Sequence, residues 1–385
     1  MPALTAYAIV FAVAGLVTVA VTPLVRMLAE REGAVAAPDE RKVHEEPTAT
    51  IGGVAMLVGF LVAVGAAALL DEFDTVFASG TEIVGVVIAA VVIFAVGLID
   101  DIREISAPAK TAGMVLAGSI LSFAGVGLLV FRVPFLDLFL LSPDWSALLT
   151  VIWVLLMANA INFIDGLDGL AAGIVAIAAG TFFLYAVRLG DADVLLASNP
   201  GALIAAITLG VCVGFLPHNF HPARIFMGDS GALLLGLLMA ASTMSVGGRS
   251  AEPFSGQAFF FFAPIFIPLI ILAVPIIDTA FAVVRRASRR RSPLAADKEH
   301  LHHRLMKLGH GHRRSVLIMW AWTLLLCGFV LYPTYTGSGD AIVPFGIGGL
   351  MLLLYTVFHP GLRNERWSNL FRSSRSDADS DTPVG

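Results

Sequence analysis

The sequence predicts an all-α fold, a polytopic bundle of transmembrane helices with about eleven spans. Composition is the first observation behind this prediction, because the chain is 57% hydrophobic and only 14% charged, with a mean hydropathy of +0.86. A soluble domain carries roughly 25% charged residues. The second observation is that long apolar runs recur along the chain, each near the length of about 20 residues that crosses a bilayer as a helix.

The expected spans all lie within residues 1–362, which are predicted to form one transmembrane domain that carries the chemistry. The first run lacks a basic segment and a cleavage site, so it is interpreted as a span and not as a removed signal. The ninth contains three prolines and is expected to be kinked or broken. The runs are residues 4–25, 51–70, 82–99, 110–131, 146–164, 169–187, 202–217, 231–247, 258–284, 315–333 and 341–358. The polar residues 363–385 are predicted to be a disordered cytosolic tail.

Positive charge predicts the orientation of the spans. With the N-terminus outside, only Arg132, Arg188 and Arg249 fall in outer loops, which leaves 21 of the 24 Lys and Arg residues on the cytosolic side. The same orientation places all nine histidines on that side. We therefore expect the C-terminus and an active site on the cytosolic face.

The stretch GLIDDIREISAPAK, residues 97–110, closes the third expected span with the adjacent acids Asp100 and Asp101. A solvated helix end is the plainer interpretation, but two acids at a helix C-terminus oppose the helix dipole, which favours cations there. Paired carboxylates at a membrane edge suit a metal–phosphate site or a proton acceptor. Lys110 alone would be an ordinary cytosolic cation, whereas beside the acids it is a candidate phosphate ligand.

The stretch NAINFIDGLDGLAAG follows the fifth expected span and spaces its polar residues by three. These residues are Asn159, Asn162, Asp165 and Asp168. In a helix, that spacing brings the four side chains near one face. A polar loop between two spans is the alternative, but the regular spacing favours a ligand-facing edge.

The stretch PHNFHPARIFMGDSGALLLG leads into the eighth expected span through Asp229 and Ser230. Helix capping alone would explain Asp229. A helix N-terminus also attracts anions, so a carboxylate there could hold Mg²⁺ while main-chain amides face phosphate oxygens. Asn219 precedes this position, and Phe226 offers a flat face to a base.

Residues 285–309 combine an arginine cluster with several histidines. The five arginines fit the positive-inside pattern and suit anionic lipid. Downstream of them lie His300, His302, His303 and Arg304. Zinc binding by these histidines lacks supporting Cys or HxxxH spacing, so phosphate or sugar contact is the favoured interpretation.

Two further stretches give little indication by themselves. Lys42 and His44, in the loop before the second expected span, fit plain cytosolic charges, and Gly52 and Gly53 fix the turn into that span. Asp278 lies within an expected span, where an ion pair and a catalytic role are both open.

These stretches, in this order, resemble the polyprenyl-phosphate N-acetylhexosamine-1-phosphate transferase family over about residues 38–315. The resemblance is carried by DDxx(D/E) at 100–104, NxxNxxDGxDGLA at 159–171, FMGDSG at 226–231 and HxHH at 300–303. Each stretch alone would be weak, but four in one order are specific. The HxHH form resembles the WecA/TagO branch, because three consecutive histidines are typical of the MraY branch and Leu301 interrupts them here.

The resemblance implies that an undecaprenyl or decaprenyl phosphate attacks the β-phosphorus of a UDP-N-acetylhexosamine, with N-acetylglucosamine as the favoured sugar. UMP leaves, Mg²⁺ is required with Mn²⁺ as an expected substitute, and the product starts a cell-envelope glycan. Catalytic roles are implied for Asp100, Asp101, Lys110 and His300, and metal binding for Asp229 and Asn162. Substrate contacts are implied for Asp165, Asp168, Asn219, Phe226, His302, His303, Arg304, Lys42 and His44.

The implied partners are these two substrates, the lipid bilayer of a bacterial-type plasma (inner) membrane, and a second copy in a homodimer. A net charge of −5 does not suggest nucleic acid. Two alternatives are an MraY-type phospho-N-acetylmuramoyl-pentapeptide transferase and, from another class, a secondary transporter. A transporter predicts polar residues near the membrane midplane and internal repeats, whereas this sequence shows no clear repeat and its acids cluster at span ends.

Overall fold

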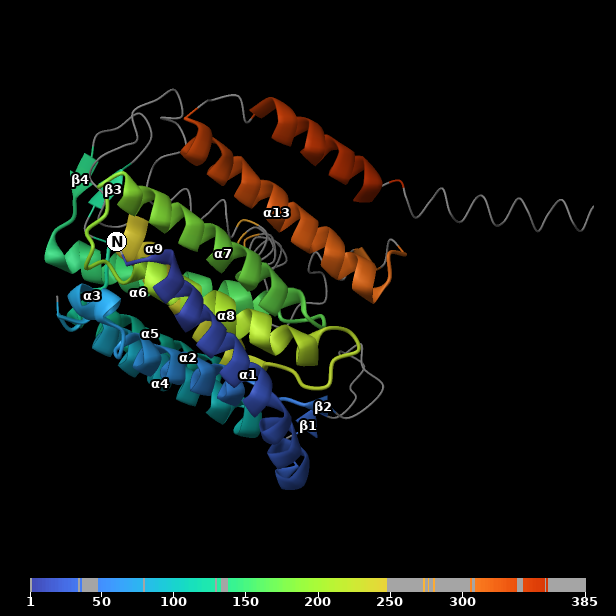
Figure 1. Ribbon diagram of the computed structural model, residues 1–385. Coiled ribbons are helices and arrows are strands. Elements are labelled where there is room, and N and C mark those ends of the chain that lie inside the picture. Colours follow the sequence, from blue (N-terminus) through green and yellow to red (C-terminus); the bar gives the residue numbers. More distant parts are fainter. Residues whose placement is uncertain are drawn as a thin grey trace, which may run out of the picture.

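The computed structural model (Figure 1) describes the chain at residues 2–33, 35–36, 48–78, 80–128, 130–132, 138–247, 273, 276, 280, 305–306, 309–337, 342–356 and 358. Regular structure in these residues is almost entirely helical, which confirms the predicted all-α fold. Two short antiparallel pairs are the exceptions: β1 (Val35–Ala36) pairs with β2 (Thr48–Ala49), and β3 (Val130–Arg132) pairs with β4 (Leu138–Leu140).

The helices alternate in direction through the bundle. In chain order they are α1 (Leu4–Glu32), α2 (Gly53–Ala67), the 3-10 helix η1 (Asp71–Phe73), α3 (Asp74–Ala78), α4 (Glu82–Arg103), α5 (Ala107–Phe123), α6 (Pro143–Ile164), α7 (Leu170–Asp191), α8 (Gly201–Asn219), α9 (Gly228–Gly247) and α13 (His312–Thr336). A further apolar helix is Ile342–Thr356.

Seven of the described helices are long and apolar enough to cross a membrane, and a bent pair formed by α2 and residues 71–78 would make eight. The chain is therefore a multi-pass membrane protein. The predicted count of eleven spans stays a prediction, because the expected span at 258–284 and its Asp278 lie outside the described residues, as does the expected tail at 363–385.

Two expected spans end earlier than predicted. α5 ends at Phe123 and not at residue 131, because the chain turns at Gly125, whose φ of 89° a right-handed helix cannot contain. Strand β3 takes the place of the expected helix end. α2 ends at Ala67, after which the chain bends by 92° into residues 71–78.

Helix α9 lies at the centre of the bundle. It contacts α2, α4, α6, α7 and α8. Outside these, α1 packs against α2 and α8, and α5 packs against α4 and α6. The sequence of α9, GDSGALLLGLLMAASTMSVG, consists mostly of small or apolar residues on every face. Of the residues in its most apolar stretch, 94% are buried. A helix that is apolar all round is expected in such an enclosed position.

One end of the bundle gathers the polar residues. The C-terminal ends of α4, α6 and α8 meet there with the N-terminal ends of α5, α7, α9 and α13, as side-chain contacts between these ends show. We call this the polar end. Helix α13 packs against α7, where the ring of Trp320 lies so close to Gly173 that a Cβ atom at that glycine would collide with it.

Candidate active site

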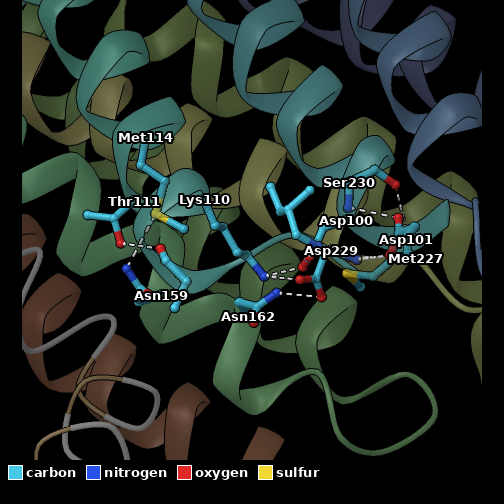
Figure 2. A network of polar contacts seen from close by, with 12 residues as sticks. Asp100, Asp101, Lys110, Thr111, Met114, Asn159, Asn162, Met227, Asp229 and Ser230 are labelled. Atoms are coloured by element: carbon cyan, nitrogen blue, oxygen red, sulfur yellow. Dashed lines mark hydrogen bonds and ion pairs between the residues drawn. The ribbon is translucent and has the colours of Figure 1, made fainter. Parts of the chain in front are cut away.

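The centre of the polar end is a cluster of four side chains from four helices (Figure 2), which we call the acidic cluster: Asp100, Lys110, Asn162 and Asp229. The ammonium of Lys110 lies 3.0 Å from Oδ2 of Asp100 and also contacts Oδ2 of Asp229. Nδ2 of Asn162 donates a hydrogen bond of 2.9 Å to Oδ1 of Asp229. The structure thus brings together four residues that the sequence singled out from three separate stretches.

The acidic cluster is partly enclosed and keeps an excess of negative charge. The side chains of Lys110 and Asp100 are 17% and 16% exposed, and that of Asp229 is 31% exposed. One ammonium faces two carboxylates, which shows that a positive charge is stabilised at this point. Carboxylate and amide oxygens are hard ligands of the kind that Mg²⁺ prefers, so the side chains present here fit a divalent cation.

Asp101 has a different place from its neighbour Asp100. Its Oδ1 accepts a hydrogen bond of 2.7 Å from the amide of Asp229, and its Oδ2 accepts one of 3.0 Å from the amide of Ser230. The carboxylate therefore caps the N-terminus of α9 from another helix, where the helix dipole favours a negative charge.

This placement corrects the expected use of the N-terminus of α9. The sequence suggested that these amides would face phosphate oxygens, but Asp101 occupies the amides of Asp229 and Ser230. The alternative that Asp229 is itself only a cap is also wrong, because its carboxylate points to Lys110 and Asn162 (Figure 2). The carboxylate of Asp229 therefore does not cap α9 and belongs to the acidic cluster.

Two glycines allow the close approach on which this arrangement depends. Gly228 has a φ of 68°, and a Cβ atom there would collide with the main-chain carbonyl of Thr50 and with the Asp101 carboxylate. At Gly97 of α4, a Cβ atom would collide with the main chain of Asp229 and Ser230. Both positions require glycine because the neighbouring atoms leave no room for a Cβ atom.

Main-chain pairing fixes the segment that leads into α9. The amide of Phe226 donates to the carbonyl of Ala49 at 2.8 Å, and the amide of Gly52 donates to the carbonyl of Phe226 at 3.0 Å. The amide of Gly53 donates to the carbonyl of Met227 at 2.9 Å. The start of α2 therefore holds residues 226–227 in an extended form, and Asp229 follows at a fixed place.

Asp100 is fixed at the C-terminal end of α4. Its Oδ1 accepts a hydrogen bond of 2.8 Å from the amide of Ile105, and its Oδ2 faces Lys110. An acid at this position is unfavourable to the helix dipole, and the adjacent ammonium offsets that cost. Asp100 is thus the member of the acid pair that faces the cation.

As the expected span at 146–164 predicts, only the first part of the polar stretch 159–168 is helical, so its four polar residues do not share one helical face. α6 ends at Ile164, so Asn159 and Asn162 lie on the helix, whereas Asp165 and Asp168 lie in the following turn. The glycines of this turn end the helix, with Gly169 at a left-handed φ of 75°. Asn159 donates to the carbonyl of Leu155 at 2.8 Å and to the sulfur of Met114 at 3.4 Å, and is not a member of the acidic cluster.

Asp165 lies in the α6–α7 turn near two other acids. Burial, together with the negative charges of Asp101 and Asp168, raises the pKa of Asp165 to about 7. A carboxyl group of this kind takes up a proton near neutral pH unless a cation comes close. Asp165 therefore adds a titratable group between the acidic cluster and a second polar group.

The second polar group, the histidine cluster, consists of Asp168, His221 and His312. Oδ2 of Asp168 accepts hydrogen bonds from Nδ1 of His221 at 2.7 Å and from the amide of Ala223 at 3.0 Å. The amide of Asp168 donates to Nε2 of His312 at 3.0 Å. The rings of His221 and His312 stack with centroids 4.2 Å apart.

The atoms of the histidine cluster have the types and spacing of metal ligands, within 4.8 Å of one another. The lone pair of Nε2 of His312 is nevertheless used by the amide of Asp168. Oδ2 of Asp168 is likewise used by two donors. The arrangement is therefore a hydrogen-bonded network that fixes the turn.

Asn219 is buried and bonded to main chain on both sides. Its Oδ1 accepts from the amide of Gly169 at 3.0 Å, and its Nδ2 donates to the carbonyl of Ile225 at 3.0 Å. Asn219 thus joins the α6–α7 turn to the segment before Phe226. A direct substrate contact, the role implied for Asn219 by the family resemblance, stays a prediction.

The sequence predicted no role for His221 or His312. His312 lies 144 positions from Asp168, and no periodic pattern connects them. Several residues with implied roles lie outside the described residues, so their roles stay predictions: Lys42, His44, His300, His302, His303 and Arg304.

Comparison with known proteins places this site in a family. Residues 83–247 match the family model described as glycosyl transferase family 4. The chain is 40% identical over 357 residues to the decaprenyl-phosphate N-acetylglucosaminephosphotransferase of Mycolicibacterium smegmatis, covering 91% of this chain and 87% of the relative.

Two further relatives are less similar. The chain is 37% identical over 324 residues to a probable undecaprenyl-phosphate N-acetylglucosaminyl 1-phosphate transferase of Bacillus subtilis, covering 84% and 82% of the two chains. It is 32% identical over 353 residues to the phospho-N-acetylmuramoyl-pentapeptide-transferase of Desulforudis audaxviator, covering 85% and 96%. The similarity is therefore higher to the two relatives named for N-acetylglucosamine phosphate transfer.

Proposed function

Because the chain belongs to glycosyl transferase family 4, we propose that it transfers N-acetylglucosamine 1-phosphate from UDP-N-acetylglucosamine to a polyprenyl phosphate of the membrane. The names of the relatives at 40% and 37% identity support this reaction over pentapeptide transfer. The observation that carries the proposal is the convergence of Asp100, Lys110, Asn162 and Asp229 at one end of an otherwise apolar bundle.

The reaction is an in-line substitution at phosphorus. An oxygen of the polyprenyl phosphate forms a bond to the β-phosphorus of the nucleotide sugar. The bond from that phosphorus to the bridging oxygen breaks, and its electron pair stays on the α-phosphate of UMP. Such a transfer needs charge neutralisation and positioning more than covalent catalysis, so we propose direct attack without an aspartyl intermediate.

The acidic cluster fits Mg²⁺, with Mn²⁺ as a proposed substitute. Asp229 would hold the metal with its carboxylate and Asn162 with its amide oxygen. When bound, the metal would neutralise charge on the diphosphate. The support is the chemistry of the donor set and the two carboxylates that already share one ammonium.

Phosphate binding, proton acceptance and positioning would each fall to a different residue of the chain. Lys110 carries a point charge suited to the incoming phosphate. Asp100 faces the same space and would accept a proton from the lipid phosphate or orient it. Asp101 would keep Asp229 in place through the N-terminus of α9. His300 is proposed to contact the diphosphate from the cytosolic loop.

The nucleotide is proposed to lie against the α6–α7 turn and Phe226. Asp165 would contact the nucleotide from the turn, and the ring of Phe226 would stack on the base. Asp168 and Asn219 would fix the shape of this pocket, because Asp168 accepts from the amide of Ala223 and Asn219 accepts from the amide of Gly169. Further sugar or phosphate contacts are proposed for His302, His303, Arg304, Lys42 and His44.

Charge supports an orientation with the polar end in the cytosol and the N-terminus outside. Among the described residues, Arg132 and Arg188 lie toward the opposite end. The polar end holds Arg26, Arg31, Arg103, Lys110, Arg224, Arg313 and Arg314. The positive-inside rule supports a cytosolic position for this end. We propose the bacterial inner membrane as the location of the protein, where an enzyme can take a soluble nucleotide sugar and a lipid held in the leaflet.

A secondary transporter fits the described helices less well. Every Asp, Glu, Lys and Arg in the described membrane-spanning helices lies within about two turns of a helix end. A transporter would place ionisable residues near the midplane.

Release of UMP tests the proposed function. Membranes that contain the protein are incubated with UDP-N-acetylglucosamine, with and without polyprenyl phosphate. UMP should form only when both substrates are present, should stop with EDTA and should return with Mg²⁺ or Mn²⁺. The Asp229→Ala variant serves as the inactive control. The proposed homodimer is tested separately, by light scattering of the purified protein in detergent. Absence of UMP under every condition would refute the proposal.

A further inference from the structure

His312, the first residue of α13, contacts two segments that lie far from it in the chain. One is the α6–α7 turn, residues 165–169, where the amide of Asp168 donates to Nε2 of His312 at 3.0 Å. The other is the α8–α9 loop, where the ring of His221 stacks on that of His312 at 20° between planes. These are the two segments on which the proposed nucleotide pocket is built.

The hydrogen bond defines the protonation of His312. A main-chain amide can only donate, so Nε2 of His312 must accept, which requires the neutral ring with its proton on Nδ1. The side chain is 8% exposed, so water competes little for this bond. A buried amide that loses its acceptor is costly, and the turn is therefore expected to depend on this ring.

Further contacts fix the start of α13 relative to the site. Nε of Arg313 donates to the carbonyl of His221 at 3.2 Å. Trp320, two turns further along α13, packs closely on Gly173 of α7. The imidazole of His312 is thus presented by a helix whose position is set by contacts on both sides.

We propose that His312 is a positioning residue that holds the α6–α7 turn and the α8–α9 loop in register for nucleotide binding. The proposal rests on the proposed function, because it needs Asp165 and Phe226 to face the nucleotide. His312 touches no substrate. It acts through the amide of Asp168 and the ring of His221, so its loss misplaces the two nucleotide-facing segments.

Two substitutions at one position separate the acceptor from the ring. His312→Phe keeps an aromatic ring that can stack on His221 but has no acceptor for the amide of Asp168. His312→Gln loses the ring but places an amide oxygen near the position of Nε2. His218→Gln is the matched control, because His218 is a partly exposed histidine at the end of α8 whose ring contacts the carbonyl of Val19, away from the α6–α7 turn.

Amide hydrogen exchange of the purified, ligand-free protein reads the contact without reference to activity. Peptides that contain residues 165–169 should exchange faster in His312→Phe than in wild type, and His312→Gln and His218→Gln should exchange like wild type. Unchanged exchange in the Phe variant, or equal acceleration in a folded Gln variant, would overturn the proposed contact. This readout stands even if the proposed reaction fails.

Kinetics then test whether the contact serves the reaction. In His312→Phe the KM for UDP-N-acetylglucosamine should rise about tenfold, the effect of roughly one lost hydrogen bond, with kcat within about threefold of wild type. His312→Gln should restore most of the KM. A loss of kcat alone, or a KM like that of wild type in a Phe variant with accelerated exchange, would overturn the positioning role.

Discussion

Replacing Asp101 separates a positioning role from a chemical one within the acid pair. Asp101 accepts two amides at the start of α9, whereas Asp100 faces Lys110. Asp101→Ala removes both acceptors and Asp101→Asn leaves one carbonyl oxygen. Asp100→Asn is the matched control, because it changes the neighbouring residue in the same chemical way without touching the amides of α9.

The structure sets the size of the expected change. A hydrogen bond to a charged acceptor contributes roughly 1.5–3 kcal/mol, so complete loss of two would cost about 3–6 kcal/mol. Replacement of an N-cap by alanine costs less, about 0.5–2 kcal/mol, because water takes over part of the role. Asp101 is partly exposed, so we expect the lower range, about 2 kcal/mol for Ala and about half of that for Asn.

Thermal unfolding in detergent without ligands is the assay, followed by UMP release on the same preparations. Asp101→Ala should lower both the melting temperature and the rate, and Asp101→Asn should lower each by less. Asp100→Asn should keep a melting temperature near that of wild type while turnover is lost. An Asp101→Asn protein as stable as wild type but inactive would refute the positioning role and assign chemistry to this carboxylate.

Three other predictions follow from the same geometry. Lys110→Met should lower kcat by roughly 10²–10³, the usual cost of losing one donor to a developing charge; a rate within about threefold of wild type would contradict this role in an initial-rate assay. Because the pKa of Asp165 is raised to about 7, the metal-free protein should lose stability as pH rises from about 4 to about 7, since the unfolded chain releases its proton first. Asp165→Asn should therefore be more stable than wild type at about pH 8, with the difference in melting temperature closing towards about pH 4, and a difference independent of pH would contradict the raised pKa. Gly228→Ala should abolish turnover, because its Cβ atom would collide with Asp101 at a φ of 68°; normal UMP release would show that the start of α9 tolerates displacement.

Much of the site was predictable because the membrane limits where charge can lie. Charged residues within a mostly apolar chain are confined to helix ends, so Asp100, Lys110, Asn162 and Asp229 were expected on one face. The structure shows them in contact. Their spacing in three short stretches was enough for this prediction, since each stretch borders an apolar run.

The separate contacts of Asp100 and Asp101 were not predictable from the spacing of residues in the sequence. Asp100 and Asp101 are adjacent and chemically identical, and only the approach of α9 to α4 at Gly97 decides which of them meets the helix N-terminus. The contact between His312 and Asp168 joins residues 144 positions apart through tertiary packing alone. The end of α6 at Ile164, by contrast, was predicted, because the apolar run stops there and glycines follow it.

The central claim is that the acidic cluster transfers a sugar phosphate to a lipid phosphate. The most direct measurement is mass spectrometry of the lipid extracted after the purified protein has been incubated with Mg²⁺, polyprenyl phosphate and, in turn, a panel of UDP-sugars. The account predicts polyprenyl diphosphate carrying N-acetylglucosamine, formed together with an equal amount of UMP. A lipid phosphate that remains unmodified, or one that is modified only when UDP-N-acetylmuramoyl-pentapeptide is supplied, would contradict it.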